Sequence, residues 1–154
     1  MSRAKELIEK LSEKNLTIGA VESFTGGSFA KALTDVSGAS KVFKGSLVTY
    51  SREVKENLLG IPSEFISKHG VVSYEVCQQM ALKGARLLGT DVTVAFTGNA
   101  GPSVCEEGSE VGEVYMAILY KGQIWPIPLK LQMERNKLKE YAVEAVLGAI
   151  LSII

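Results

Sequence analysis

The segment from Thr17 to Ser28 constrains the fold of this chain more than any other part. An apolar run ends in a polar cluster that contains Gly26 and Gly27, and a helical pattern starts directly after it. This order is typical of a buried strand, a tight turn and the first turn of a helix. The turn would bring the hydroxyls of Ser23 and Thr25 close to backbone N–H groups, because the first N–H groups of a helix have no partner within it.

Two interpretations of this turn stay open from the segment alone. In the first, a hydroxyl is a nucleophile beside N–H groups that hold an oxyanion or a phosphate. In the second, Ser23 and Thr25 cap the helix and the glycines only form the turn. The segment matches neither a P-loop nor a G-x-G-x-x-G fingerprint, so it does not by itself indicate a nucleotide site.

The rest of the chain alternates between helical and strand patterns. Helices are expected over residues 3–14, 26–35, 51–59, 62–70, 74–88 and 134–152. Strands are expected over residues 16–22, 42–50, 91–96, 111–120 and 123–131. The last two strands are joined by a two-residue turn at Lys121-Gly122, and Pro126 and Pro128 favour an edge position for the second of them. The pattern predicts one three-layer α/β domain, residues 1–154, with a mixed sheet and a late β-hairpin.

Charge and hydropathy restrict the partners. Lys and Arg total 17, as do Asp and Glu, so the chain has no basic surplus for a nucleic acid backbone. It contains no apolar run near the ~18 residues of a membrane span and no secretion signal, which predicts a cytoplasmic protein without membrane contact. A hydrophobic content of 46% in a small chain, with the apolar end Leu151-Ser152-Ile153-Ile154, predicts a homo-oligomer.

Cysteine and histidine give no indication of a metal or another cofactor, and we expect neither. Cys77 and Cys105 have neither a metal-ligand spacing nor the number needed for a disulfide framework. Cys77 is expected to be buried in a helix, and Cys105 to be exposed in a polar loop over residues 102–110. The only histidine, His69, is expected at the C-terminus of a helix, where the helix dipole favours a cation.

Hydroxyl groups follow three of the expected strands. Ser23 comes after the first strand, Tyr50 ends the second, and Thr97 follows the third. In open α/β sheets, ligands bind beyond the carboxyl ends of the strands. Lys55 follows Tyr50 on the next helix, and a lysine whose pKa is lowered can serve as a general base without histidine. Taken singly, Tyr50, Lys55 and Thr97 also suit an edge aromatic, a surface charge and a turn residue. Together they offer a hydroxyl nucleophile, a candidate amine base and donors from two glycine-rich turns.

Five motifs of the chain resemble those of the CinA C-terminal-domain family, in order and over nearly the whole length. The matching family patterns are A-E-S-x-T-G-G, L-T-x-x-x-G-A-S, S-Y-S-N-x-x-K with L-L-G-V, H-G-A-V-S and T-G-I-A-G-P. They correspond to Val21–Gly27, Leu33–Ser40, Thr49–Pro62, His69–Ser73 and Thr97–Pro102.

The resemblance implies an amidohydrolase, because active family members are nicotinamide-mononucleotide deamidases. They convert nicotinamide mononucleotide to nicotinic acid mononucleotide and ammonia without a metal, in pyridine-nucleotide recycling. By analogy, Ser23 attacks the carboxamide carbon and Lys55 is the general base. Tyr50 and Thr97 would complete the catalytic set, and the small-molecule nucleotide would be the partner.

The resemblance also implies a set of substrate-binding residues. Those in the turns after the strands are Thr25, Gly26, Gly27, Gly98 and Asn99, with backbone N–H groups near the glycines facing the oxyanion or the phosphate. Arg135 occupies the place of a family D-R pair before the last helix, where a guanidinium could bind the phosphate. The alternative for Arg135 is a surface arginine at a helix start.

The chain departs from the family pattern at three places. Asn99 replaces an apolar residue of T-G-I-A-G-P, Arg52 replaces the asparagine of S-Y-S-N, and Ser103–Glu107 replaces a glycine-rich loop. These differences leave two alternatives open: a catalytically degenerate nucleotide-binding or regulatory member of the family, and a hydrolase of another small amide.

Overall fold

The computed structural model describes residues 1–101 and 109–154 of the chain. Its centre is a five-stranded mixed sheet in the order β2-β1-β3-β4-β5. The strands are β1 (Ile18–Glu22), β2 (Phe43–Val48), β3 (Val92–Gly98), β4 (Glu113–Tyr120) and β5 (Gln123–Lys130). β1 runs parallel to β2 and to β3, whereas β3, β4 and β5 pair antiparallel. The predicted mixed sheet with a late hairpin is confirmed.

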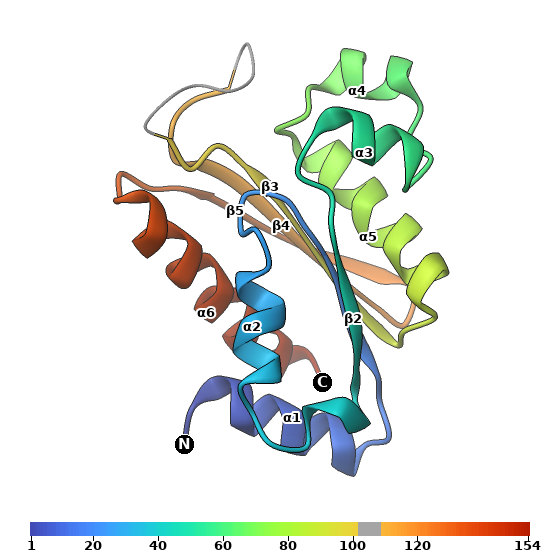
Figure 1. The fold of residues 1–154 in the computed structure, drawn as a ribbon, viewed down its shortest axis with the longest axis vertical. Coiled ribbons are helices and arrows are strands. Elements are labelled where there is room, and N and C mark those ends of the chain that lie inside the picture. Colours follow the sequence, from blue (N-terminus) through green and yellow to red (C-terminus); the bar gives the residue numbers. More distant parts are fainter. Residues whose placement is uncertain (102–108) are drawn as a thin grey trace.

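Helices cover both faces of this sheet and complete the three layers (Figure 1). They are α1 (Arg3–Glu13), α2 (Ser28–Thr34), α3 (Arg52–Asn57), α4 (Ser63–His69), α5 (Tyr74–Leu88) and α6 (Arg135–Ile153), with a 3-10 turn η1 (Ala39–Lys41) before β2. α1, α2 and α6 pack together on one face, and α5 covers β1, β3 and β4 on the other, with α3 and α4 at its N-terminal end (Figure 1).

The alternation of side chains along the strands divides the core into two clusters. Ala20, Val94 and Phe96 point toward α1, α2 and α6, whereas Val21 and Ala95 point toward α5. β1 is therefore buried along its whole length. A central strand with helices on both faces needs apolar residues at successive positions, which explains the apolar run at the start of the sequence argument.

Turn and capping residues mark the element ends largely as the sequence predicts. Ser51 and Ser73 are N-caps whose Oγ atoms accept hydrogen bonds from the N–H groups three residues later. Lys121 and Gly122 both have positive φ, of 51° and 73°, as a two-residue hairpin turn requires. β5, which contains two prolines, is one of the two edge strands.

Most predicted boundaries lie one or two residues from those of the structure, and the shifts at the start of α2 and the end of β3 have clear causes. α2 begins at Ser28 rather than at residue 26, because Gly26 and Gly27 adopt φ of +60° and +103° and form the turn before it. β3 continues to Gly98, since pairing with β4 extends to the Gly98–Val114 pair. The local pattern predicts that this strand ends at Phe96, but pairing with the antiparallel strand β4 extends it by two residues.

Three further sequence predictions concern single segments. Cys77 is buried and His69 is the last residue of α4, as expected. Over residues 1–101 and 109–154, no helix has the length and apolar character that a bilayer crossing needs. Cys105 and the divergent segment Ser103–Glu107 lie outside the described residues.

Candidate active site

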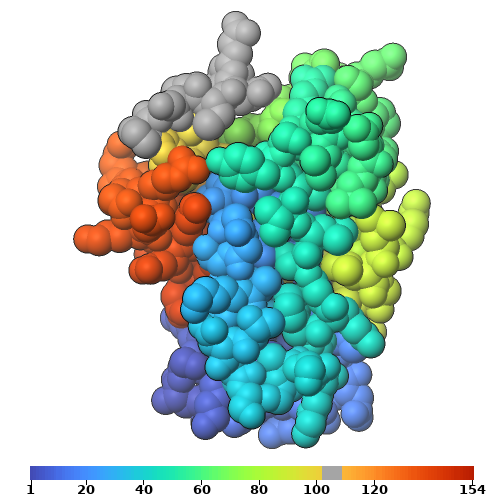
Figure 2. Space-filling view, viewed as in Figure 1, coloured from blue at the N-terminus to red at the C-terminus, as the bar shows by residue number. Residues whose placement is uncertain are grey.

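A pocket of about 270 Å³ lies beyond the carboxyl ends of the parallel strands. β2 and β3 pair with opposite edges of β1, so the strand order reverses at this place. Such switch points form crevices in which ligands bind. The described residues that line it are Ser23, Phe24, Tyr50, Ser51, Arg52, Val71, Val72, Thr97, Gly98, Ala100 and Arg135. Figure 2 shows that the start of α6, the α2 segment and the α3 region meet on this side of the molecule.

The structure brings Ser23 and Lys55 together although 32 positions separate them in the sequence. Lys55 Nζ lies 3.0 Å from Ser23 Oγ and donates a second hydrogen bond of 2.6 Å to the carbonyl oxygen of Thr49. The Lys55 side chain has no exposed surface, and Ser23 is 6% exposed. A hydroxyl and an amine at this distance form a candidate nucleophile–base pair.

Tyr50, Thr97 and Arg135 surround this pair. Thr97 Oγ1 is buried and donates to the carbonyl oxygen of Val71, 3.1 Å away. Arg135, the first residue of α6, donates through Nη1 to Gly101 O at 2.7 Å and through Nη2 to the Tyr50 hydroxyl at 3.1 Å. The Tyr50 side chain is otherwise largely exposed. The guanidinium therefore connects the start of α6 to the segment that follows β2, at the edge of the pocket.

The glycine turn is held by its own hydrogen bonds. Gly26 N–H donates to Ser23 O at 3.0 Å, and Ser28 N–H donates to Thr25 O at 3.0 Å. The expectation that the start of this helix offers unpartnered N–H groups therefore does not hold for Gly26 or Ser28. Thr25 differs from its neighbours, because its hydroxyl is buried and makes no hydrogen bond within the described part of the chain.

Gly98 and Asn99 hold the start of the following loop. A Cβ at Gly98 would lie 2.4 Å from Val114 Cγ1, so close packing of β4 requires glycine there. The Asn99 side chain donates from Nδ2 to Ser109 Oγ at 3.3 Å and accepts from Gly101 N–H at 3.2 Å. Gly98 lines the pocket, and the polar atoms of Asn99 face the loop.

Glu22, directly before Ser23 at the end of the first strand, has a role that the sequence analysis did not predict. Its buried carboxylate accepts hydrogen bonds from Phe29 N–H at 2.9 Å, Ala30 N–H at 3.2 Å and Ser46 Oγ at 2.6 Å. The first turn of α2 is thus bonded to the protein's own carboxylate, where we expected an anionic ligand. An acid at the end of a buried strand, directly before a glycine turn, is the signal that could have indicated it.

Arg52, at the position where the family has asparagine, ties α3 to α4. It donates to Glu56 Oε1 at 3.1 Å, to Ser63 O at 3.0 Å and to Ser67 Oγ at 2.6 Å. The hydrogen bond from Arg52 lowers the pKa of the Glu56 carboxyl below its ordinary value. Arg52 also lines the pocket, so two guanidinium groups and no carboxylate are found among its described lining residues.

Cys77 packs below the pocket on α5. Its Sγ contacts the carbonyl oxygens of Ala95 and Tyr115, and burial raises the pKa of the thiol. A buried thiol that resists ionisation is a poor nucleophile, so Ser23 is the better candidate. Among the described residues, no three histidine, cysteine or acidic side chains come together as metal ligands.

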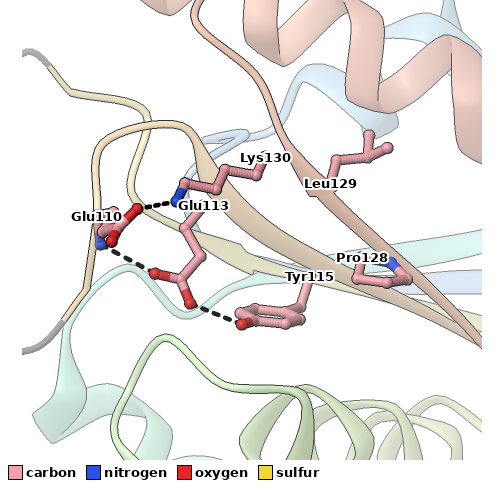
Figure 3. Close-up of a pocket in the computed structure, with 6 residues that line it drawn as sticks. All are labelled: Glu110, Glu113, Tyr115, Pro128, Leu129 and Lys130. Atoms are coloured by element: carbon pink, nitrogen blue, oxygen red, sulfur yellow. Dashed lines mark hydrogen bonds and ion pairs between the residues drawn. The ribbon is translucent and has the colours of Figure 1, made fainter.

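A second cavity, of about 380 Å³, lies at the open end of the β4–β5 hairpin (Figure 3). Glu113 accepts a hydrogen bond of 2.6 Å from the Tyr115 hydroxyl and another of 2.9 Å from Glu110 N–H, while Lys130 forms an ion pair with Glu110. The charged groups of this cavity bond to one another, and it contains none of the predicted site residues.

The fold and the site define a class: an α/β domain with a buried serine–lysine pair in a pocket beyond its parallel strands. Comparison with known proteins gives the family. The model of the CinA C-terminal domain matches residues 1–154, and the chain belongs to this family, some of whose members are amidohydrolases.

Curated relatives show the same membership. The chain is 45% identical over 122 residues, 79% of its length, to a putative competence-damage inducible protein of Bacillus subtilis. It is 48% identical over 112 residues, 73% of its length, to a CinA-like protein of Prochlorococcus marinus. The alignments span only 29% and 26% of those two proteins. A protein of Mycoplasma pneumoniae described as an MG115 homolog is 36% identical over 148 residues, with 96% of this chain and 94% of that protein aligned.

Solved structures of CinA superfamily proteins share the fold. The Escherichia coli protein superposes with a TM-score of 0.94 at 26% identity, covering 99% of this chain and 88% of that one. The Klebsiella pneumoniae protein gives a TM-score of 0.91 at 28% identity, covering 96% and 92%.

Proposed function

We propose that this chain hydrolyses the carboxamide of nicotinamide mononucleotide to nicotinic acid mononucleotide and ammonia, with Ser23 as nucleophile and Lys55 as general base. The observation that carries the proposal is the 3.0 Å between Lys55 Nζ and Ser23 Oγ in a buried pair at the pocket. A lysine acts as a base only in its neutral form, which burial favours by removing the water that solvates an ammonium.

The reaction would proceed in two stages. Ser23 Oγ bonds to the amide carbon while its proton passes to the neutral Lys55 amine. The carbon–nitrogen bond then breaks, Lys55 returns the proton to the departing nitrogen, and ammonia leaves an ester on Ser23. Water, deprotonated by the same amine, attacks the ester, releases the acid and restores the serine hydroxyl.

The pocket suits a mononucleotide in size and charge. Its volume is near the ~300 Å³ lower end of small-molecule sites, which favours a mononucleotide over a dinucleotide. Phe24, Val71 and Val72 provide apolar walls for a pyridine ring. The cations at the pocket are Arg135 and Arg52, of which Arg52 is already paired with Glu56, so Arg135 is the better candidate for a phosphate. The Thr25 hydroxyl, which is buried and makes no hydrogen bond within the described part of the chain, is a candidate for a further donor.

Ammonia release from nicotinamide mononucleotide by the purified protein tests the proposal. Ser23→Ala and Lys55→Met should each lower kcat at least ~100-fold, and the double variant should be scarcely worse, because the two groups act as one unit. Ser40→Ala and Lys31→Met change the same residue types at exposed positions and should keep parental rates. The absence of turnover on this substrate and on related pyridine carboxamides would refute the enzyme claim.

A nucleotide-binding or regulatory module without turnover is the second candidate. One observation favours it: Arg135, which the first candidate assigns to the phosphate, already donates to Gly101 O and to the Tyr50 hydroxyl. Ligand-induced thermal stabilisation without product would support this candidate, because binding to the native state alone raises stability. Turnover of a different small amide, lost in Ser23→Ala, would instead identify another substrate for the same pair.

A further inference from the structure

Glu22 connects the nucleophile turn to two neighbouring segments. It ends β1 directly before Ser23 and has no exposed surface. Its two carboxylate oxygens accept three hydrogen bonds, two from the first turn of α2 and one from Ser46 on β2. A buried carboxylate loses its hydration, so these three bonds have to replace what water would supply.

The main chain of Glu22 reaches the base as well. Its carbonyl oxygen accepts the Thr49 N–H at 2.7 Å, and the Thr49 carbonyl oxygen in turn accepts the hydrogen bond of 2.6 Å from Lys55 Nζ. One residue therefore fixes the turn that carries Ser23 and, through Thr49, the segment that orients the amine. No other described residue adjoins Ser23 in sequence and also bonds to both α2 and β2.

We propose that Glu22 is a positioning residue, whose carboxylate holds the Ser23 turn so that Ser23 Oγ stays within reach of Lys55 Nζ. This inference rests on the proposed function of the Ser23–Lys55 pair. All three groups that face the carboxylate are donors: two peptide N–H groups and a hydroxyl. The site therefore needs two acceptor oxygens, and an amide offers only one.

The variant Glu22→Gln tests the need for two acceptor oxygens, because it replaces one oxygen by an NH2 group and keeps the side chain nearly the same size. Its NH2 group would face a donor, leave one peptide N–H of α2 without an acceptor and displace the turn. We expect kcat for ammonia release to fall at least ~10-fold while KM changes less than ~3-fold, because a displacement of about 1 Å at the reacting atoms is sufficient for a large rate loss. Ser46→Ala is the matched control. It removes the third donor, the Ser46 hydroxyl, but leaves both Glu22 oxygens bonded to the N–H groups of α2. It should lower kcat less than ~3-fold.

A second readout separates this inference from the choice of substrate. A fluorophosphonate probe labels an activated serine irrespective of the natural substrate, and the mass of the intact protein follows the labelling of Ser23. If the parent is labelled but does not turn over nicotinamide mononucleotide, the proposed substrate is refuted, and the labelling rate still tests the positioning role of Glu22. Labelling of Glu22→Gln at the parental rate, in a variant with parental circular dichroism, would overturn the inference.

If Glu22→Gln does not fold, Glu22→Asp decides the question. The shorter acid keeps both oxygens, but it cannot reach the two N–H groups of α2 and Ser46 from the same backbone position. Slower labelling of Ser23 in folded Glu22→Asp supports the positioning role, and parental labelling overturns it. A parent that is neither labelled nor active would refute the Ser23–Lys55 mechanism and, with it, the role of Glu22.

Discussion

At the scale of single residues, Thr25 stands out because its hydroxyl is buried without a partner in the described part of the chain. Buried polar atoms in native proteins nearly always have a hydrogen bond, so an exception needs an explanation. Under the proposed function, we expect a hydrogen bond to the bound substrate to be that explanation, because Thr25 lies two positions after Ser23.

Thr25→Val tests that explanation. The free energy of unfolding should stay constant or rise, because an unsatisfied buried group is itself unfavourable by ~1–3 kcal/mol. The rate of ammonia release should fall at least ~10-fold, since a hydrogen bond of this kind is worth about 1.5 kcal/mol or more when it reaches a charged group. Urea unfolding and steady-state kinetics measure the two effects.

Thr97→Val is the control for stability. It removes a hydroxyl that does have a partner, the Val71 carbonyl, and should lower the free energy of unfolding by about 1 kcal/mol. A Thr25→Val variant that loses stability as much as Thr97→Val would show that the Thr25 hydroxyl has a structural partner after all.

Tyr115 gives a prediction on pH. Its hydrogen bond to Glu113 raises the pKa of the phenol to about 12, because the carboxylate favours the protonated hydroxyl (Figure 3). The folded-state pKa lies above the ordinary value near ~10, so the neutral phenol stabilises the fold fully below about pH 10. That contribution is lost as the pH rises from about 10 through about 12.

Ultraviolet absorbance titration of tyrosinate checks this. A component with a pKa near 12 should be present in the parent, absent in Tyr115→Phe, and shifted toward lower pH in Glu113→Gln. An unchanged titration curve in Glu113→Gln would contradict the assigned cause.

At the scale of elements, the start of α6 decides where Arg135 lies. Glu134 caps this helix by accepting hydrogen bonds from Asn136 N–H and Lys137 N–H, and these bonds lower the pKa of its carboxyl. Because the pKa of Glu134 is lowered in the folded state, the cap stabilises the fold fully at pH values above the ordinary pKa of a glutamate. This contribution is lost as the pH falls through the lowered pKa.

Glu134→Ala should therefore loosen the first turn of α6 and displace the Arg135 guanidinium. We expect KM for nicotinamide mononucleotide to rise several-fold, and little change for the riboside that lacks the phosphate, because the proposed function assigns the phosphate to Arg135. Glu140→Ala, an exposed position further along the same helix, is the control and should leave both values unchanged. Equal effects on the nucleotide and the riboside would argue against the phosphate assignment.

At the scale of the whole molecule, α5 packs so closely on the sheet that a glycine is required at the contact. A Cβ at Gly84 would lie 2.3 Å from Val21 Cγ2, on β1. Gly148, inside α6, would instead place its Cβ 2.9 Å from the far end of the flexible Arg3 side chain. The two positions share helical conformation and differ in what they meet.

Gly84→Ala should therefore destabilise the protein by ~1–3 kcal/mol through overpacking. The gain in helix propensity, ~1 kcal/mol, is too small to reverse this at Gly84 and should leave Gly148→Ala neutral or slightly more stable. Urea unfolding of both variants measures the difference. Equal free energies of unfolding for the two variants would show that α5 can shift away from β1 at little cost.

Much of the fold could be predicted because its signals are local. Helix caps at Ser51 and Ser73, the positive-φ turn at Lys121-Gly122 and the proline-containing edge strand each depend on a few neighbouring residues. The boundary shifts at the start of α2 and the end of β3 depend on the glycine turn and on pairing with β4. Homo-oligomerisation and the roles of the site residues stay predictions.

The sequence by itself determined the order of helices and strands, the family, and the placement of Ser23, Tyr50 and Thr97 at or just after the carboxyl ends of neighbouring parallel strands. Hydrophobic periodicity and turn residues are local features of short segments, so the sequence alone was sufficient to predict these properties. Only the tertiary structure decided that Glu22 occupies the N–H groups of α2 and that Arg135 bonds to Tyr50, 85 positions away. Contacts of this kind depend on strand order, register and side-chain direction, which no local pattern contains.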